Sequence, residues 1–159
     1  MIQRIEVNEN GLNIVQLGAA IDTIPAVMPL RLHPNRNLLL TGFNEEFEYY
    51  FINGKGMFLG DAAVVKDLFI AAGKRNEIVG VFLVIEPNTQ ITNILNEAFG
   101  SAKLQSNSSI EGINTGGKTF WKKNDVSVFL TATNVSLYST ITIRRVPFDN
   151  KAPEVYIQY

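Results

Sequence analysis

The chain has no cysteine and a single histidine among its 159 residues. The missing cysteine excludes disulfides, thiolate nucleophiles and thiolate metal ligands. The one imidazole, His33, precedes a proline and has no second histidine with which to share a metal ion, so we predict a loop histidine and not a catalytic base. Glu46 and Glu48 follow a single strand pattern and offer no opposed pair of carboxylates for acid–base catalysis. We therefore expect no catalytic residue, no cofactor and no metal ion.

Charge and long apolar runs are also scarce. Charged residues make up 18% of the chain, against about 25% in an average protein, and 14 basic residues nearly balance 15 acidic ones. This near-neutral sum argues against a nucleic-acid or anionic-membrane partner. The longest apolar run, Ile78–Ile85, is far shorter than the roughly 20 residues of a membrane helix, and no signal-peptide core follows Met1. We expect a cytoplasmic protein if Met1 is the native start; a secreted chain trimmed of its signal would look the same.

Hydrophobic residues form 46% of the sequence, which is enough to build the core of one domain spanning residues 1–159. Several segments have strand patterns, and Ile78–Ile85 is apolar on both faces, as expected of a central strand. The other predicted strands are Ile2–Val7 and Leu12–Leu17 as a hairpin, Glu46–Ile52 turned back by Asn53–Gly56 into Met57–Leu59, Thr119–Lys122 and Val126–Ala132 as a hairpin, Tyr138–Val146, and weakly Val155–Ile157.

The stretch 61–73 fits two structures. It is either a helix capped by Asp61 and ended by Gly73, or a strand over Val64–Ile70 that turns into Ile78–Ile85. We favour the strand, because Ile78–Ile85 needs a neighbour and the polar tip after Gly73 suits a hairpin.

Two helices are predicted. Thr89–Phe99 has an apolar stripe at helical spacing, with Asn88 as its N-cap and Gly100 at its end. Ala19–Met28 has weaker helical spacing, and its prolines limit it to about two turns. The polar segment Ser101–Gly117 is predicted to be a long loop.

These elements predict an α+β fold of two similar halves, at about 11–86 and 87–146, followed by a tail at 147–159. Each half has a short helix followed by three or more antiparallel strands, with the helices packed on one face of the sheet. The matching segments are Ala19–Met28 with Thr89–Phe99, Tyr49–Phe51 with Lys118–Trp121, and Val79–Ile85 with Ser139–Arg145.

From Leu17-Gly18-Ala19 onward, the predicted order is a short helix followed by strands. The same order recurs in the second half, where the helix ends at Gly100. Over residues 11–146 this pattern resembles the tandem helix-plus-sheet repeat of the β-lactamase inhibitor proteins. It is also similar to the single unit of the outer-membrane assembly lipoprotein BamE. The resemblance implies a non-enzymatic module that binds another protein across its sheet.

Residues 112–119, with the sequence GINTGGKT, match the phosphate-binding pattern G-x-x-x-x-G-K-[ST]. A working loop of this kind needs a buried strand before it and a helix after it. Here the preceding residues are polar, and the following residues, from Phe120, have a hairpin pattern. We attribute the match to chance.

The strand pattern near the C-terminus assigns side chains to two faces. If Lys123-Asn124 is a two-residue turn, Trp121 pairs with Val126 and both face the core, together with Val128, Leu130, Ile141 and Ile143. The opposite face mixes aromatic, threonine and arginine side chains, a composition suited to partner binding. The partner-binding residues that we predict on this face are Phe120, Phe129, Tyr138 and Arg144.

We therefore predict a non-catalytic protein-binding module of the inhibitor or immunity-protein kind. Its partner is expected to be another protein, with no nucleic acid or membrane, and a homodimer is left open. One alternative is a small-molecule-binding domain with an apolar pocket lined by Phe47, Tyr49, Phe51 and Val81. The other is an enzyme, either nucleotide-dependent through Lys118 or hydrolytic.

Overall fold

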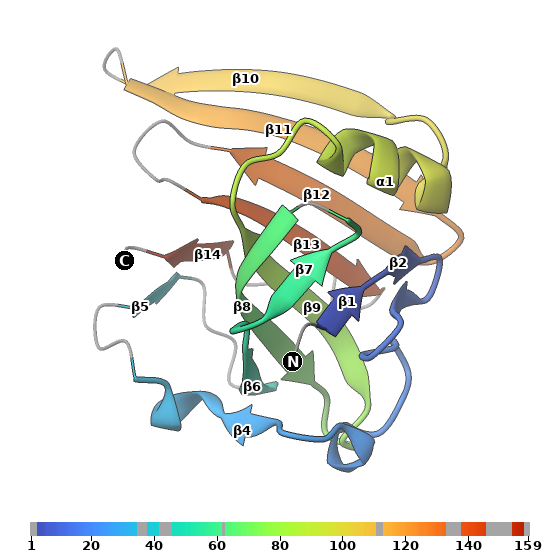
Figure 1. Ribbon diagram of the computed structural model, residues 1–159, viewed down its shortest axis with the longest axis vertical. Coiled ribbons are helices and arrows are strands. Elements are labelled where there is room, and N and C mark those ends of the chain that lie inside the picture. The colour runs from blue at the N-terminus through green and yellow to red at the C-terminus, as the bar shows by residue number, and fades with distance from the viewer. Residues whose placement is uncertain are drawn as a thin grey trace.

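The structure is a computed structural model that describes residues 3–34, 38–41, 46–61, 63–110, 113–132, 138–145 and 154–157. For residues 38–41, 104–110, 113–118, 132 and 154–157 it describes the backbone alone. Ten of the described strands form one large curled sheet (Figure 1). These strands are β1 (Gln3–Ile5), β4 (Met28–Pro29), β6 (Glu48–Asn53), β7 (Met57–Leu59), β8 (Ala63–Ala72), β9 (Ile78–Ile85), β10 (Leu104–Ile110), β11 (Ile113–Lys123), β12 (Val126–Ala132) and β13 (Ser139–Arg145).

The strand order runs from β1 through β7, β8, β9, β13, β12 and β11 to β10. β6 also pairs with β8, and β4 pairs with β6. Every pair in this sheet is antiparallel except β1 with β7. Two small two-stranded sheets complete the strands: β2 (Val7–Asn8) with β3 (Gly11–Leu12), and β5 (Leu38–Thr41) with β14 (Glu154–Ile157).

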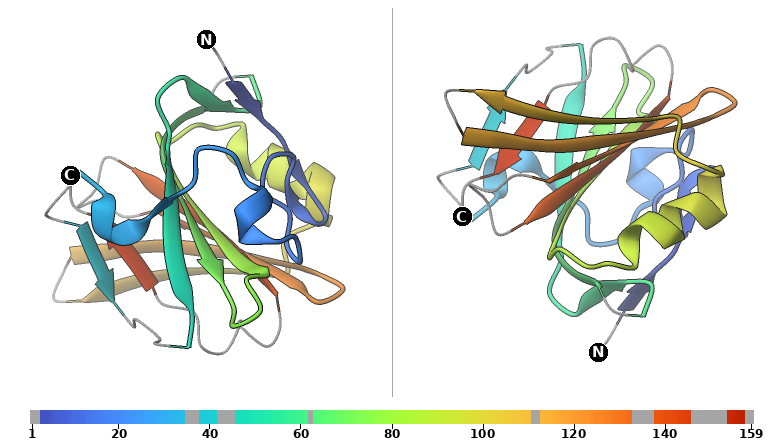
Figure 2. Two further views of the ribbon diagram at one scale, coloured as in Figure 1. Left: turned by 90° about the horizontal axis from the view of Figure 1, so that it is seen from below. Right: turned by 90° about the horizontal axis from the view of Figure 1, so that it is seen from above.

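The large sheet has two unlike faces, seen nearly edge-on in Figure 2. One face is covered by the N-terminal segment, the 3₁₀ turn η1 (Ile21–Thr23) and the helix α1 (Ile91–Phe99). We call it the core face. The other, which we call the outer face, has the 3₁₀ turn η2 (Leu30–Leu32) and the β5–β14 pair on its side.

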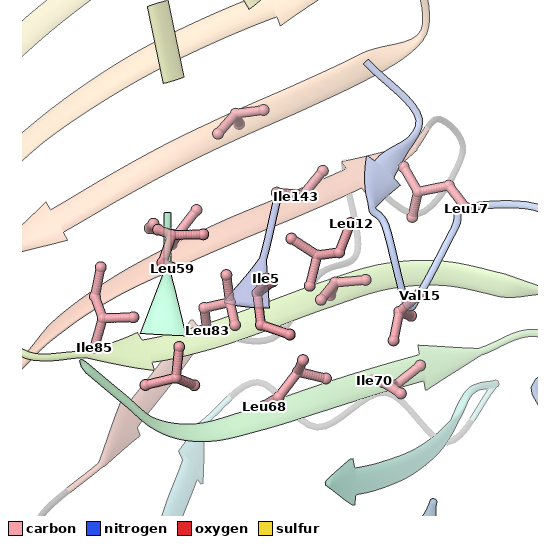
Figure 3. Close-up of a cluster of buried hydrophobic side chains, with 14 of the residues drawn as sticks. Ile5, Leu12, Val15, Leu17, Leu59, Leu68, Ile70, Leu83, Ile85 and Ile143 are labelled. Atoms are coloured by element: carbon pink, nitrogen blue, oxygen red, sulfur yellow. The ribbon is translucent and has the colours of Figure 1, made fainter. Parts of the chain in front are cut away.

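The main core lies between the N-terminal segment and the core face of the sheet (Figure 3). Ile5, Leu12 and Val15 have no exposed surface and lie over the strands β8, β9 and β13. Full burial of each such side chain contributes roughly 1.5–3 kcal/mol to folding. The N-terminal segment is therefore held to the sheet mainly by apolar packing.

Strand β9 is buried on both faces, as its sequence predicts. Val81, Leu83 and Ile85 belong to the core-face cluster, whereas Phe82 and Val84 belong to a second cluster on the outer face. Strand β8 forms the hairpin partner of β9 and extends over residues 63–72, so the strand favoured for 61–73 is confirmed and the helix is not formed.

The prediction of two similar helix-plus-sheet halves is wrong. The helix predicted at 89–99 is formed as α1, but the segment Ala19–Met28 contains only the three-residue turn η1 and the start of β4. Pro25 lacks an amide hydrogen, and Ala26 adopts a positive φ of 61°, so helical geometry cannot continue there. Within the described residues the fold is one large sheet with a single α-helix, and the two halves of the chain are not equivalent.

The loop predicted over Ser101–Gly117 is also wrong, because β10 and the first part of β11 pair there as antiparallel strands. The hairpin of β11 and β12 is confirmed, but its register differs from the prediction by two residues. Trp121 pairs with Val128, and Lys123 pairs with Val126 across a turn in which Asn124 has a φ of 56°. Side chains alternate with a period of two, so the faces assigned from the sequence are unchanged.

A glycine bend joins β6 to β7. The sequence suggests that Met57–Leu59 turns back on Glu46–Ile52, but both strands run along the same edge of β8. Residues 54–57 lie opposite only residues 65–66, so the chain bulges away from β8 between β6 and β7. A Cβ atom on Gly54 would lie 2.5 Å from the carbonyl oxygen of Lys66, which explains why glycine occupies the bend.

Among the helices that the structure describes, none has the length and apolar character needed to cross a membrane.

Candidate functional site

A row of large side chains crosses the outer face of the sheet. Residues directly opposite one another on adjacent strands point to the same face. The register therefore places one residue from each of β4, β6, β8, β9, β13, β12 and β11 in line across the sheet. In that order they are Met28, Phe51, Phe69, Phe82, Thr142, Phe129 and Phe120. We call the five phenylalanines the aromatic row; Thr142 is the polar position that interrupts it.

The part of the row on β6, β8 and β9 is buried. Phe51, Phe69 and Phe82 are 4%, 3% and 1% exposed. They form a cluster with Tyr49, and Leu30 of η2 packs against this cluster. The segment that carries η2 thus covers this half of the outer face.

His33 follows η2 outside any helix or strand, as predicted for a loop histidine, and it is buried within this cover. Its ring meets the ring of Phe51 edge-on at 4.7 Å and that of Phe69 at 5.6 Å. Its Nε2 atom lies 3.1 Å from Oδ1 of Asp67 on β8, and both side chains are buried. A buried carboxylate is costly unless it is paired, so this contact fixes the covering segment to the sheet. No local sequence pattern indicates the pair, because Asp67 lies within strand β8 and His33 is 34 residues earlier in the chain.

The part of the row on β11 and β12 is half-buried. The rings of Phe120 and Phe129 lie 4.9 Å apart, and the guanidinium carbon of Arg144 lies 4.3 Å from the centre of the Phe129 ring. Among the described residues, neither phenylalanine belongs to the two buried clusters. The cation over the ring and the ring pair hold these side chains in a defined arrangement.

The structure brings together three of the four predicted binding residues. Phe129 contacts both Phe120 and Arg144. Tyr138 lies four positions before Thr142, about 13 Å along the strand direction, and packs against the buried aromatic cluster. The four residues therefore do not form a single patch.

Lys122 extends the group of three. It is exposed and lies two residues beyond Phe120 on the same face of β11. The described outer-face side chains of β11, β12 and β13 include Lys122 and Arg144 but no acidic residue. We call Phe120, Lys122, Phe129 and Arg144 the aromatic–cationic patch.

The apolar pocket predicted as an alternative does not have the residues that were assigned to it. Tyr49 and Phe51 are buried in the outer-face cluster, and Val81 faces the core on the opposite side of the sheet. An open hollow of about 530 Å³ does exist elsewhere, between the N-terminal strands, α1 and the β11–β12 turn. Its lining includes Arg4, Glu6, Glu9, Glu97 and Lys123, and ion pairs of exposed side chains span part of it. Its lining mixes charged and apolar side chains, and it lies away from the aromatic row.

Residues 113–119 of the GINTGGKT segment lie in strand β11, and Gly112 lies outside the described residues. The strand continues past Lys118 to Lys123 and turns directly into β12. No helix begins at Lys118 or Thr119 to present amide hydrogens to a phosphate.

In the part of the chain that the structure describes, no three histidine, aspartate or glutamate side chains lie close enough together to hold a metal ion. Comparisons of the chain with protein-family models, with curated proteins and with solved structures found no match. The resemblance to β-lactamase inhibitor proteins and BamE therefore stays a prediction.

Proposed function

We propose that this chain is a non-catalytic binding module that docks another protein on the aromatic–cationic patch. The observation that carries the proposal is the division of one aromatic row into two halves. Phe51, Phe69 and Phe82 are covered by the chain itself, while Phe120 and Phe129 continue the same row and are only half-buried. A second protein on β11–β13 would complete the cover that η2 begins.

The composition of the patch supports a protein partner. Aromatic residues and arginine are enriched at binding hot spots, where they combine a large apolar area with directed polar contacts. Contact between Arg144 and Phe129 restrains both side chains before binding, which reduces the entropy lost on association.

The charges of the patch indicate what the partner presents. Lys122 is exposed, and Arg144 adds a second positive charge on the same face of the sheet. A complementary surface is apolar at its centre with carboxylates beside it. The net charge of the whole chain is −1, which argues against a nucleic acid as the partner.

The proposal is tested by placing a photo-crosslinking residue at position 122 in the source cells, with the same residue at position 93 on α1 as the control. Asn93 is exposed and lies on the opposite side of the sheet from the patch. We expect a protein to be crosslinked from position 122 and not from position 93.

The crosslinked protein is then purified and its affinity measured. Phe129→Ala should weaken binding about tenfold or more, because a central aromatic anchor is lost. Leu32→Ala removes a side chain that is 49% exposed but lies outside the patch, and should leave the affinity unchanged. Equal losses for both variants, or none for Phe129→Ala, would reject the patch as the binding surface.

A further inference from the structure

The far edge of the sheet differs from its other free edges. β10 pairs with β11 and, among the described strands, with no other, so its second row of backbone donors and acceptors faces outward (Figure 1). An edge of this kind is a template for pairing with another strand, and natural proteins usually block it with charge, proline or short length.

The other edges carry such protection. β1 has three residues, and its Arg4 makes ion pairs with Glu6 and Asp61. β4 has two residues, one of which is Pro29. β10 has seven residues, Leu104–Ile110, with neither a charged residue nor a proline.

The sequence of β10 suits antiparallel pairing with an identical strand, centred on Asn107. Counting outward from Asn107, the matched positions are Ser106 with Ser108, Gln105 with Ser109, and Leu104 with Ile110. An antiparallel pair of identical strands related by a two-fold axis at Asn107 brings these positions opposite one another. Polar residue types then pair with polar ones, and an apolar residue type pairs with an apolar one.

We infer that β10 pairs with β10 of a second copy of this chain, antiparallel and in register at Asn107. The resulting homodimer has one sheet that continues through both copies. The inference does not depend on the proposed function, because the paired edge and the aromatic–cationic patch use different atoms of the molecule.

The dimer is expected to be weak. A single pair of edge strands buries less than the roughly 1,600 Å² of a standard interface. It is therefore formed at high protein concentration and lost on dilution.

The absence of native cysteine permits a direct test of the register. In Asn107→Cys, the two new side chains face each other across the axis, at a Cα separation of about 4.5–5.5 Å that a disulfide can span. Under mild oxidation with copper phenanthroline, this variant should form a covalent dimer rapidly. In Gln105→Cys, the new cysteine lies opposite position 109 of the second copy and not opposite another cysteine, so this variant should crosslink at least tenfold more slowly. The control Asn93→Cys, on the helix α1, should be equally slow. Equal rates for the three variants would overturn the inference.

Sedimentation equilibrium provides an independent readout. Wild type should show a concentration-dependent dimer, whereas Asn107→Lys and Asn107→Glu, each alone, should associate about tenfold more weakly because like charges meet. An equimolar mixture of the two should regain association. A wild type that stays monomeric at millimolar concentration, or a mixture that associates no better than either variant, would overturn the inference. Crosslinking from position 122 to another protein is not affected by either result.

Discussion

Two hydrogen bonds between side chains connect separate elements to the sheet at the scale of single residues. His33 contacts Asp67 from the segment that covers the outer face. On the core face, the indole Nε1–H of Trp121 donates to Oδ1 of Asn96 at 2.8 Å, joining β11 to α1. Trp121 is fully buried, so the assignment of the single tryptophan to the core is confirmed. Each contact gives a polar group a partner in an apolar setting, where an unpaired group is costly.

Asn96→Ala tests the contribution of the second bond. The substitution leaves a buried indole N–H without its acceptor, and we expect a loss of about 2 kcal/mol in the free energy of unfolding. Asn93→Ala, on the exposed side of the same helix, should change it by no more than about 0.5 kcal/mol. Urea unfolding followed by tryptophan fluorescence measures both. Equal effects of the two substitutions would show that the bond adds nothing beyond helix propensity.

At the scale of elements, the bend at Gly54 decides how β6 and β7 line β8. The two strands run along the same side of β8, and the bend lets the chain change register between them. The backbone of Lys66 approaches so closely that no side chain fits at residue 54.

Gly54→Ala should lower the free energy of unfolding by about 2 kcal/mol, because the new methyl group must push a backbone carbonyl aside. Gly73→Ala is the matched control: its Cβ would have no neighbour closer than 3.8 Å, and its effect should lie within about 0.5 kcal/mol. If the two alanine variants unfold at the same urea concentration, the close approach at the bend is not real.

The elements that could be predicted are those in which the order of apolar and polar residues shows which side chains are buried. α1 has an apolar stripe, β9 is apolar throughout, and β12 and β13 alternate, so each was found from its sequence. β10 has a polar sequence with no alternation, and its strand structure depends on pairing with β11, which a local pattern does not reveal. The helix predicted at Ala19–Met28 is not formed. Its apolar spacing suits a helix, but Pro25 and the positive φ of Ala26 prevent helical geometry from continuing.

The candidate site was predictable in part. Alternation along β11 and β12 was enough to assign Phe120 and Phe129 to the outer face, and an error of two residues in the register did not change that face. The alignment of these residues with Phe51, Phe69 and Phe82 depends on pairing between distant strands. No local sequence pattern indicates it, and so Tyr138 was grouped with the wrong neighbours.

At the scale of the whole molecule, one sheet separates a closed core from an outer face whose described residues are buried to different degrees. The N-terminal segment and α1 close the core face (Figure 2). On the outer face, η2 and His33 cover the aromatic row over β6, β8 and β9, and the phenylalanines of β11 and β12 that continue the row are half-buried. The proposed binding function depends on this difference in burial among the described residues.

Hydroxyl-radical footprinting of the intact protein, read residue by residue by mass spectrometry, tests that division most directly. Oxidation of an aromatic ring requires solvent access, so Phe120 and Phe129 should be modified several-fold faster than Phe51, Phe69 and Phe82, which are chemically identical and lie in the same row. If Phe129 is instead protected as well as Phe82, the outer face is covered throughout and the proposed docking surface does not exist.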